Sequence, residues 1–116
     1  MKQALYCKRK SKKTVELLGC EIEYFILWMR YQFEEDMTIE NFGEICSFDH
    51  VIPCASFKLD DLEDQLKCFN WTNIRPCIKS ENCSKGAKII PSLIYEQCEK
   101  VQNFLNHVFL VKILNE

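Results

Sequence analysis

The hexapeptide FDHVIP, residues 48–53, places an acid beside one of the two histidines of the chain. Residues 45–53 are rich in residue types that favour β-strands, and Pro53 does not continue the hydrogen bonding of a strand. The pattern predicts a strand that carries Asp49 and His50 close to its end. Because successive strand residues point to opposite faces, these two side chains reach one spot only where the strand twists or breaks.

A short helix and a second strand are predicted downstream. Residues 60–68 are amphipathic, and Asp60 or Asp61 is placed to cap the first turn of a helix. Residues 71–77 favour a strand, which we expect Pro76 to break. The helix would separate the two strands along the chain.

The segment after the second strand has the pattern of a turn that opens a helix. Ser-Glu-Asn at residues 80–82 supplies the turn, and residues 84–88 allow one or two helical turns. Asn82 and Lys85 would then stand near a helix N-terminus. Strand, strand and short helix is the predicted outline of residues 44–90.

Helices are expected on both sides of this region. Residues 14–18 suggest a short helical or turn segment, and the apolar spacing over residues 21–35 predicts an amphipathic helix. A final helix is predicted from Pro91 to about Leu114. Its last part is apolar on more than one face, which indicates deep burial or self-association, so a homodimer through this helix is one expected outcome. His107 within it is interpreted as an ordinary packed or surface histidine.

Length and composition indicate one compact domain, and the predicted strands and helices make it an α+β one. The chain has 116 residues, 47% of them hydrophobic, with three glycines and three prolines, which suits an ordinary folded core. We divide it into a basic arm with an N-terminal helix (1–43), a core (44–90) and a C-terminal helix (91–116). No apolar run is long enough to span a bilayer and no signal peptide is recognisable, so we expect an intracellular protein with no membrane partner.

The eight cysteines lack the spacing of a usual zinc site. No two of them form a Cys-x-x-Cys pair, whereas structural zinc sites usually take two ligands from one tight turn. An intracellular setting also keeps thiols reduced. Reduced, mostly buried cysteines are the main expectation, and an irregular zinc site assembled from distant cysteines is the alternative.

Charge is distributed unevenly along the chain. Residues 1–13 carry six basic groups and no acid, although the whole chain has a net charge of −2. Such an arm suits a protein that reaches for phosphate groups. The alternative is a solvated N-terminus without a partner.

Five residues of the central region offer the groups that phosphodiester hydrolysis requires. The reaction needs a cation to stabilise charge on the phosphate and a base to activate water. Asp49 and Asn82 offer oxygen ligands of the kind that Mg²⁺ accepts, and His50 offers a base that titrates near neutrality. Asn73 can hold the intervening loop through its amide, and Lys85 can meet a phosphate oxygen. Taken singly, Asp49 fits a turn acid, Asn73 a turn residue and Asn82 a helix cap.

Three motifs give the central region a resemblance to a known family. DHVIP (49–53), TNIRP (72–76) and ENCSKG (81–86) resemble, in order, the three parts of an HNH endonuclease of the type found in large DNA viruses, phages and mobile elements. The flanking segments LLGC (17–20), CASFKL (54–59) and CFNW (68–71) extend the resemblance over roughly residues 14–90.

The resemblance implies a ββα-metal (HNH, or His-Me finger) core with flanking N- and C-terminal helices. In that core Asp49 and Asn82 would bind one Mg²⁺ or Mn²⁺, and zinc is less favoured because the ligand position of the third motif is Asn82 rather than a histidine. His50 would be the general base, and Asn73 would orient the loop and the His50 ring. DNA contacts are expected from six basic residues, which are Lys85, Lys88, Arg75, Lys8, Arg9 and Lys10.

The function implied is that of a metal-dependent HNH endonuclease that nicks or cuts DNA. The alternative is a catalytically silent HNH-fold module that holds DNA. The sequence departs from the family in two places: ICSF at 45–48 replaces a Trp-His pair that many relatives have, and Ile39 stands where a tryptophan is usual. Local aromatic packing is therefore expected to differ.

Overall fold

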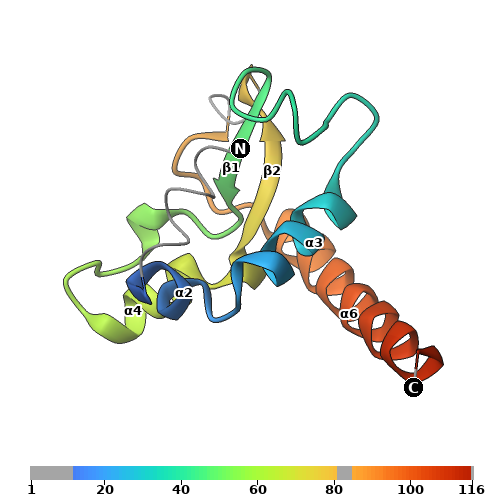
Figure 1. Cartoon of the computed structure of the whole chain (residues 1–116). Helices are drawn as coiled ribbons and strands as arrows, with labels where there is room; N and C mark the ends of the chain where they lie inside the picture. Colours follow the sequence, from blue (N-terminus) through green and yellow to red (C-terminus); the bar gives the residue numbers. More distant parts are fainter. Residues whose placement is uncertain (1–11, 81–84, 116) are drawn as a thin grey trace.

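The computed structural model describes residues 12–80 and 85–115, and in these ranges the chain is an α+β protein (Figure 1). Its elements follow in the order α2 (Lys12–Leu18), α3 (Ile22–Gln32), β1 (Cys46–His50), the 3-10 turn η1 (Cys54–Ser56), α4 (Leu62–Phe69), the 3-10 turn η2 (Trp71–Asn73), β2 (Ile74–Ile78) and α6 (Pro91–Leu114). Four residues with predicted roles lie outside the described residues: Lys8, Arg9 and Lys10, predicted to contact DNA, and Asn82, predicted to bind metal.

Within the described residues, β1 and β2 form an antiparallel pair of strands, drawn side by side in Figure 1. Asp49 lies opposite Arg75, and His50 lies opposite Ile74. Directly opposed residues of an antiparallel pair share a face, and the face alternates along each strand. The register therefore directs the Asp49 and Arg75 side chains to one face of the ribbon, and the His50 side chain to the other.

The expectation that Pro76 breaks the second strand was wrong. β2 runs from Ile74 to Ile78 through the proline, which lies opposite Phe48. The bonds that flank this pair run from Val51 N to Asn73 O and from Lys79 N to Ile45 O. Hydrogen-bonded and non-bonded pairs alternate along an antiparallel ladder, so the Phe48–Pro76 pair falls on a non-bonded position. Proline at that position removes no bond between the strands.

The helix expected over residues 84–88 does not continue past Lys85, and residue 84 lies outside the described residues. The backbone is helical at Lys79, Ser80 and Lys85, and residues 86–87 form a turn. Gly86 has a φ of 56°, the left-handed conformation that glycine adopts at low cost just after a helix end. Lys85 is thus the last helical residue before a turn, and it does not stand at a helix N-terminus.

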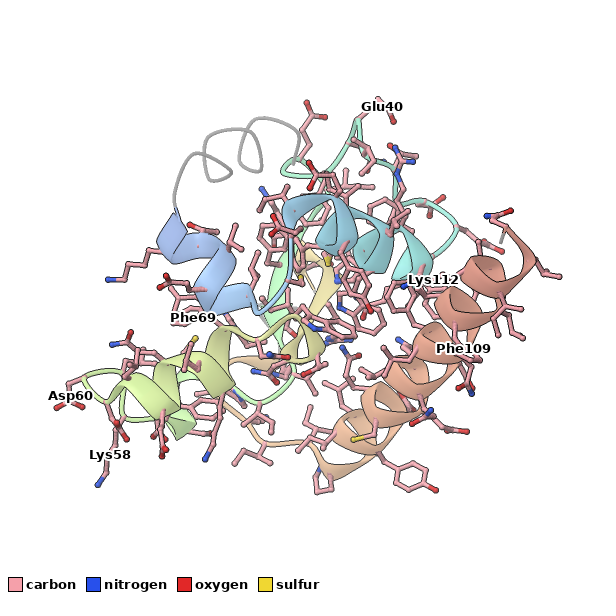
Figure 2. All side chains as sticks on the ribbon, turned by 60° about the horizontal axis from the view of Figure 1, so that its bottom comes forward. Glu40, Lys58, Asp60, Phe69, Phe109 and Lys112 are labelled. Carbon is pink, nitrogen blue, oxygen red and sulfur yellow. The ribbon has the colours of Figure 1, made fainter. Side chains whose placement is uncertain are left out.

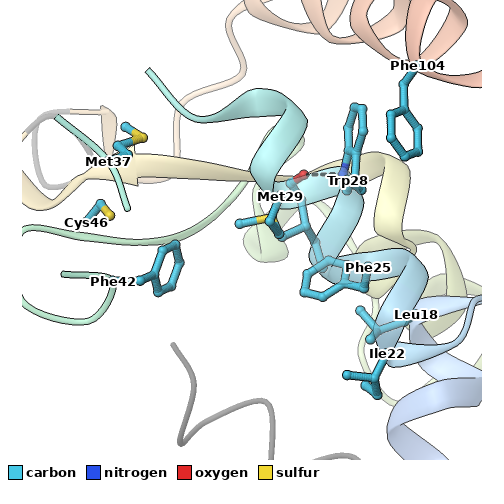
Figure 3. Packing of buried hydrophobic residues seen from close by; sticks show 10 residues of the cluster. Leu18, Ile22, Phe25, Trp28, Met29, Met37, Phe42, Cys46 and Phe104 are labelled. Carbon is cyan, nitrogen blue, oxygen red and sulfur yellow. Dashed lines mark hydrogen bonds between the residues drawn. The ribbon is translucent and has the colours of Figure 1, made fainter. Parts of the chain in front are cut away.

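Helix α3 supplies the centre of the hydrophobic core. Its buried residues recur along one side of the helix and are Ile22, Phe25, Trp28, Met29 and Gln32. They pack with residues from α2, β1, β2, α6 and the loop between α3 and β1 (Figure 3). The helix predicted over residues 21–35 is confirmed in position, and it ends at Gln32, just before the acidic residues that a helix C-terminus disfavours.

Trp28 is fully buried at 0% exposure, because the helix is covered from a second direction. The Trp28 ring lies 5.1 Å from that of Phe104 on α6 and 5.2 Å from that of Trp71 on η2, measured between centroids. Its Nε1 donates to the carbonyl of Ile74 at 3.0 Å, the dashed line in Figure 3. This bond ties α3 to the first residue of β2.

Helix α6 packs on the core by its N-terminal part and extends away from the rest of the chain at its C-terminal end (Figure 1). Gln97 and Phe104 are its buried residues. The apolar side chains beyond Phe104 are largely exposed and include Leu105, Phe109, Leu110, Val111, Ile113 and Leu114; Figure 2 shows Phe109 and Lys112 on this part of the helix. His107 is exposed and lies beside the ring of Tyr31, as an ordinary surface histidine does. No helix in the described ranges is both long and apolar enough to cross a membrane.

The homodimer remains a prediction, and α6 gives it a direct test. Phe109 is 62% exposed, so Phe109→Glu should cost the fold little while placing a charge in an apolar interface. We expect this change to shift the chain from dimer to monomer in sedimentation velocity. Tyr95→Glu is the matched control, because Tyr95 is 73% exposed on the part of α6 that packs on the core. A wild-type chain that sediments as a monomer at every concentration would contradict the prediction.

Candidate functional site

Asn73 lies at the centre of the candidate site and holds the loop that follows β1. Its Oδ1 accepts from the backbone N–H of Ile52 at 2.8 Å, and its Nδ2 donates to the carbonyls of Ile52 and Cys68, both at 3.0 Å. Its own carbonyl accepts from Val51 N at 2.8 Å. Asn73 is 8% exposed, so these bonds are shielded from water. The amide thus makes the loop-holding contacts that the sequence predicted for it.

The position of Asn73 is fixed by the turn that precedes β2. Sequence had extended the strand back to Trp71, but residues 71–73 form the 3-10 turn η2. Asn70 causes this difference, because its Oδ1 accepts from the N–H of Thr72 at 3.0 Å and from the Thr72 hydroxyl at 2.6 Å. Such a side-chain cap competes with strand hydrogen bonding. The turn places the Asn73 side chain within hydrogen-bonding distance of the loop after β1.

His50 is oriented by the backbone of α4. Its Nδ1 lies 3.0 Å from the carbonyl oxygen of Cys68, and a carbonyl only accepts, so Nδ1 carries the proton and Nε2 keeps its lone pair. The same Cys68 carbonyl is the one that Asn73 holds. Asn73 therefore acts on the His50 ring through a shared acceptor, which a backbone atom supplies.

The environment of His50 favours its neutral form. Burial lowers the pKa of the imidazole below its ordinary value, and the nearby positive charge of Lys85 adds to this effect. The hydrogen bond to Cys68 and the charge of Asp49 act in the opposite direction, but the pKa remains lowered. A neutral ring with a free Nε2 lone pair is the form that a general base requires.

Asp49 is buried and faces two cationic side chains. Nε of Arg75, its partner across the strands, donates to Oδ2 at 2.8 Å. Nζ of Lys85 lies 3.7 Å from Oδ1 and donates to the His50 carbonyl at 3.0 Å. Lys85 is 7% exposed, which differs from the surface lysine expected for a DNA contact. The ion pair with Asp49 compensates the cost of burying its charge.

Three of the predicted DNA-binding residues lie together. Arg75, Lys85 and Lys88 line an open hollow of about 440 Å³ between β2 and the start of α6. His50 instead lines a different pocket, of about 240 Å³, whose other walls are mainly apolar and include Phe48 and Phe69. The alternation of side chains along β1 explains this separation, as the sequence had indicated for adjacent strand residues.

The sequence left open a zinc site assembled from distant cysteines but named no ligands, and the structure places a cluster of possible metal ligands around His50. His50, Cys54 and Cys68 each offer a ligand atom, and these atoms lie within 4.8 Å of one another. None of the six described cysteines is in a disulfide; Cys46, Cys68 and Cys77 are buried, and of the six only Cys98 is exposed. Burial and the neighbouring Cys54 raise the pKa of Cys68 to about 12, so its thiol is protonated at neutral pH.

The chain is similar to two proteins of Acanthamoeba polyphaga mimivirus. It is 43% identical to "Uncharacterized protein L426" over 100 residues, which cover 86% of this chain and 44% of that protein. It is 45% identical to "Uncharacterized protein L246" over 75 residues, which cover 65% of this chain and 33% of that protein. The chain thus spans less than half the length of these relatives. No protein-family profile and no solved structure matches it.

Proposed function

We propose that this chain is the core of a metal-dependent HNH-type endonuclease that hydrolyses DNA phosphodiester bonds. The observation that carries the proposal is the arrangement of His50 and Asn73 around the Cys68 carbonyl, which leaves His50 Nε2 free as a base. The antiparallel β1–β2 pair, followed by helical backbone at Lys79, Ser80 and Lys85, is compatible with a ββα-metal core. The three motifs quoted above support the same proposal.

His50 would take a proton from the water that attacks the phosphorus. Its neutral state and its fixed Nδ1–H bond prepare Nε2 for that role. Asn73 would act as a positioning residue, because its amide fixes both the loop after β1 and the carbonyl that orients the imidazole. General bases of this kind typically contribute roughly 10²–10⁴-fold to a rate.

The Asp49 carboxylate has the chemistry of a hard-cation ligand and already attracts two cationic side chains. Oδ2 is bonded to Arg75, whereas Lys85 Nζ lies 3.7 Å from Oδ1, beyond an ordinary hydrogen bond. Asp49 would hold Mg²⁺ or Mn²⁺ through Oδ1, with Lys85 moving aside and Asn82 as the second protein ligand. When bound, the ion would stabilise negative charge on the phosphate and the leaving oxygen.

DNA would lie across the end of β1, with the scissile phosphate between the His50 and Asp49 side chains and the flanking phosphates over the hollow lined by Arg75, Lys85 and Lys88. Lys88 is exposed and available to a phosphate, and Lys85 would become available if a metal ion replaced it at Asp49. Residues 1–13 add six basic groups to the chain. Binding through such contacts weakens steeply as salt is added.

A second candidate function is a catalytically silent HNH-fold module that holds DNA. Two specific observations favour it: Arg75 and Lys85 already compensate the charge of the Asp49 carboxylate, and His50 lines a mainly apolar pocket apart from the basic hollow. This module would bind DNA with a strong salt dependence and would cleave nothing. The two functions predict opposite results in a single assay.

That assay is cleavage of supercoiled plasmid by the full chain with Mg²⁺, with Mn²⁺ and with excess EDTA. We expect nicked or linear product with either ion and none with EDTA. Asp49→Asn should reduce cleavage to background, because an amide oxygen binds a divalent ion more weakly than a carboxylate does. Asp60→Asn is the matched control, since Asp60 is exposed and remote from the motifs. Salt-sensitive DNA binding by a folded wild-type chain that never cleaves would refute the nuclease and establish the silent module.

A further inference from the structure

His50, Cys54 and Cys68 come together from three separate elements. His50 ends β1, Cys54 begins η1 and Cys68 lies in the last turn of α4. Cys68 Sγ is 3.3 Å from Cys54 Sγ and 4.0 Å from His50 Nδ1. With Zn–S bonds of about 2.3 Å and Zn–N bonds of about 2.0 Å, the ligand atoms of a tetrahedral zinc ion lie about 3.5–3.8 Å apart. Small side-chain adjustments would therefore bring all three atoms to bonding distance.

We propose that these three side chains form a binding site for a thiophilic divalent ion such as Zn²⁺, separate from the oxygen-ligand site at Asp49. Thiolate and imidazole ligands favour zinc over magnesium, whereas carboxylate and amide oxygens favour magnesium. Asp49 and Arg75 occupy the opposite face of the β1–β2 ribbon from His50, so the two sites do not share ligands. Two chemically different sites then lie on the two faces of one strand end.

The charge and accessibility of the cluster suit a reversible site. Zinc binding would release both thiol protons to solvent, and two thiolates would neutralise the ion, so no net charge would be buried. Cys68 is buried, while His50 and Cys54 are half-buried and leave an approach for the ion. Three protein ligands and one water complete four-coordinate zinc, an open arrangement rather than a closed structural one.

Occupation of this site removes the lone pair that His50 needs as a base, a consequence that rests on the proposed nuclease function. Nδ1 faces Cys68 Sγ, so it is the nitrogen that zinc would take. Its bond to the Cys68 carbonyl would be lost, and the proton of the neutral ring would reside on Nε2. A ring metallated at Nδ1 and protonated at Nε2 accepts no proton from water. Zinc at the cysteines is therefore expected to switch cleavage off.

Co²⁺ gives a readout of the site that does not depend on activity. We would titrate the metal-free full chain with Co²⁺ under a non-thiol reductant and record its absorption. Thiolate ligation should produce near-ultraviolet sulfur-to-cobalt bands and visible bands of tetrahedral Co²⁺, which one equivalent of Zn²⁺ should abolish. Cys54→Ser should weaken binding by more than the roughly 10–100-fold that loss of an outer-shell partner costs a metal site. Cys98→Ser, at an exposed cysteine of α6, should leave the bands unchanged.

Cleavage with Mg²⁺, measured with and without one equivalent of Zn²⁺, tests whether zinc at this site switches cleavage off. For each variant, the cleavage rate with Zn²⁺ is divided by its rate without Zn²⁺, and these ratios are compared. A variant whose rate without Zn²⁺ differs from the wild type can therefore still be used. We expect inhibition of roughly 10²-fold or more in the wild type and in Cys98→Ser, because a lost general base costs at least that much. Cys54→Ser should be inhibited little.

The outcomes separate the two proposals. Absence of thiolate–cobalt bands, or bands that survive Cys54→Ser, would overturn the zinc site whatever the nuclease does. Equal inhibition of Cys54→Ser and wild type would overturn the link to His50. Thiolate bands in a chain that never cleaves would support the zinc site and reject the nuclease.

Discussion

Replacing His50 with alanine should lower metal-dependent plasmid cleavage by roughly 10²–10⁴-fold, the usual contribution of a positioned general base. The imidazole bonds through Nδ1 to the Cys68 carbonyl at 3.0 Å, with a longer contact to Cys68 Sγ at 4.0 Å, so its loss should leave the fold largely intact. Salt-dependent DNA binding should change little, because the basic hollow lies on the other face of the strand end. The chemical step alone would then be lost.

His107 provides the matched control for this change. The chain contains two histidines, and His107 is exposed on α6, with its ring centroid 6.4 Å from that of Tyr31. His107→Ala should cleave at the wild-type rate. Cleavage by His50→Ala at the wild-type rate would show that another group activates the water, or that a contaminating nuclease is being measured. Cleavage lost equally in both variants would indicate a general effect of handling rather than a base.

The pH dependence of cleavage gives a second view of His50. Only the neutral ring accepts a proton, and burial lowers its pKa below the ordinary value of 6.5. As pH falls, the base stays neutral until its own lowered pKa is reached, so the acid limb of the rate profile should lie below pH 6.5. A limb at or above that value, in a chain whose circular dichroism is unchanged, would contradict the lowered pKa.

The sequence predicted the parts of the site that depend on local pattern. The strand bearing Asp49 and His50 and the capped helix α4 follow from residues close together in the chain. The loop-holding role of Asn73 was predicted from its amide and its place in the second motif, although its partner Ile52 lies 21 residues away. The choice between Asp60 and Asp61 as the cap is settled for Asp61, whose side chain accepts from Glu63 N. Strand alternation also predicted that neighbouring side chains of β1 would diverge.

The remaining parts depend on register and on backbone atoms, which have no sequence signature. Asp49 meets Arg75 only because the strands align so that these residues are opposed. His50 and Asn73 both donate to the carbonyl of Cys68. Every residue type has a carbonyl, so this shared acceptor leaves no mark in the sequence. The cluster of His50, Cys54 and Cys68 forms because α4 turns its last residues back toward β1, and a spacing of 14 between the cysteines does not reveal that. Long-range packing decides all three features.

Asn73→Ala should be the most damaging polar substitution in the site. It removes the acceptor of the Ile52 N–H and the donor to two carbonyls, in a residue that is 8% exposed. A buried polar group left without its partner costs about 1–3 kcal/mol. We therefore expect the free energy of unfolding to fall by about 3 kcal/mol in urea titrations, since water can reach part of the loop and repair some of the loss. Asn103→Ala, at an exposed position of α6, should change it by less than about 0.5 kcal/mol.

Asn73→Asp separates the effect of the side chain's shape on cleavage from the effect of its hydrogen bonds, because aspartate has nearly the same shape as asparagine. Aspartate keeps an acceptor for the Ile52 N–H but turns the donor that faces the Ile52 and Cys68 carbonyls into a second acceptor. Three oxygens would then converge, and the Cys68 carbonyl would be displaced from the His50 ring. Cleavage by Asn73→Asp should therefore fall nearly as far as that of Asn73→Ala, at a temperature where both variants are folded, with KM little affected. If Asn73→Asp retained wild-type cleavage, the ring would be held by something other than the shared carbonyl, and Asn73 would only stabilise the loop.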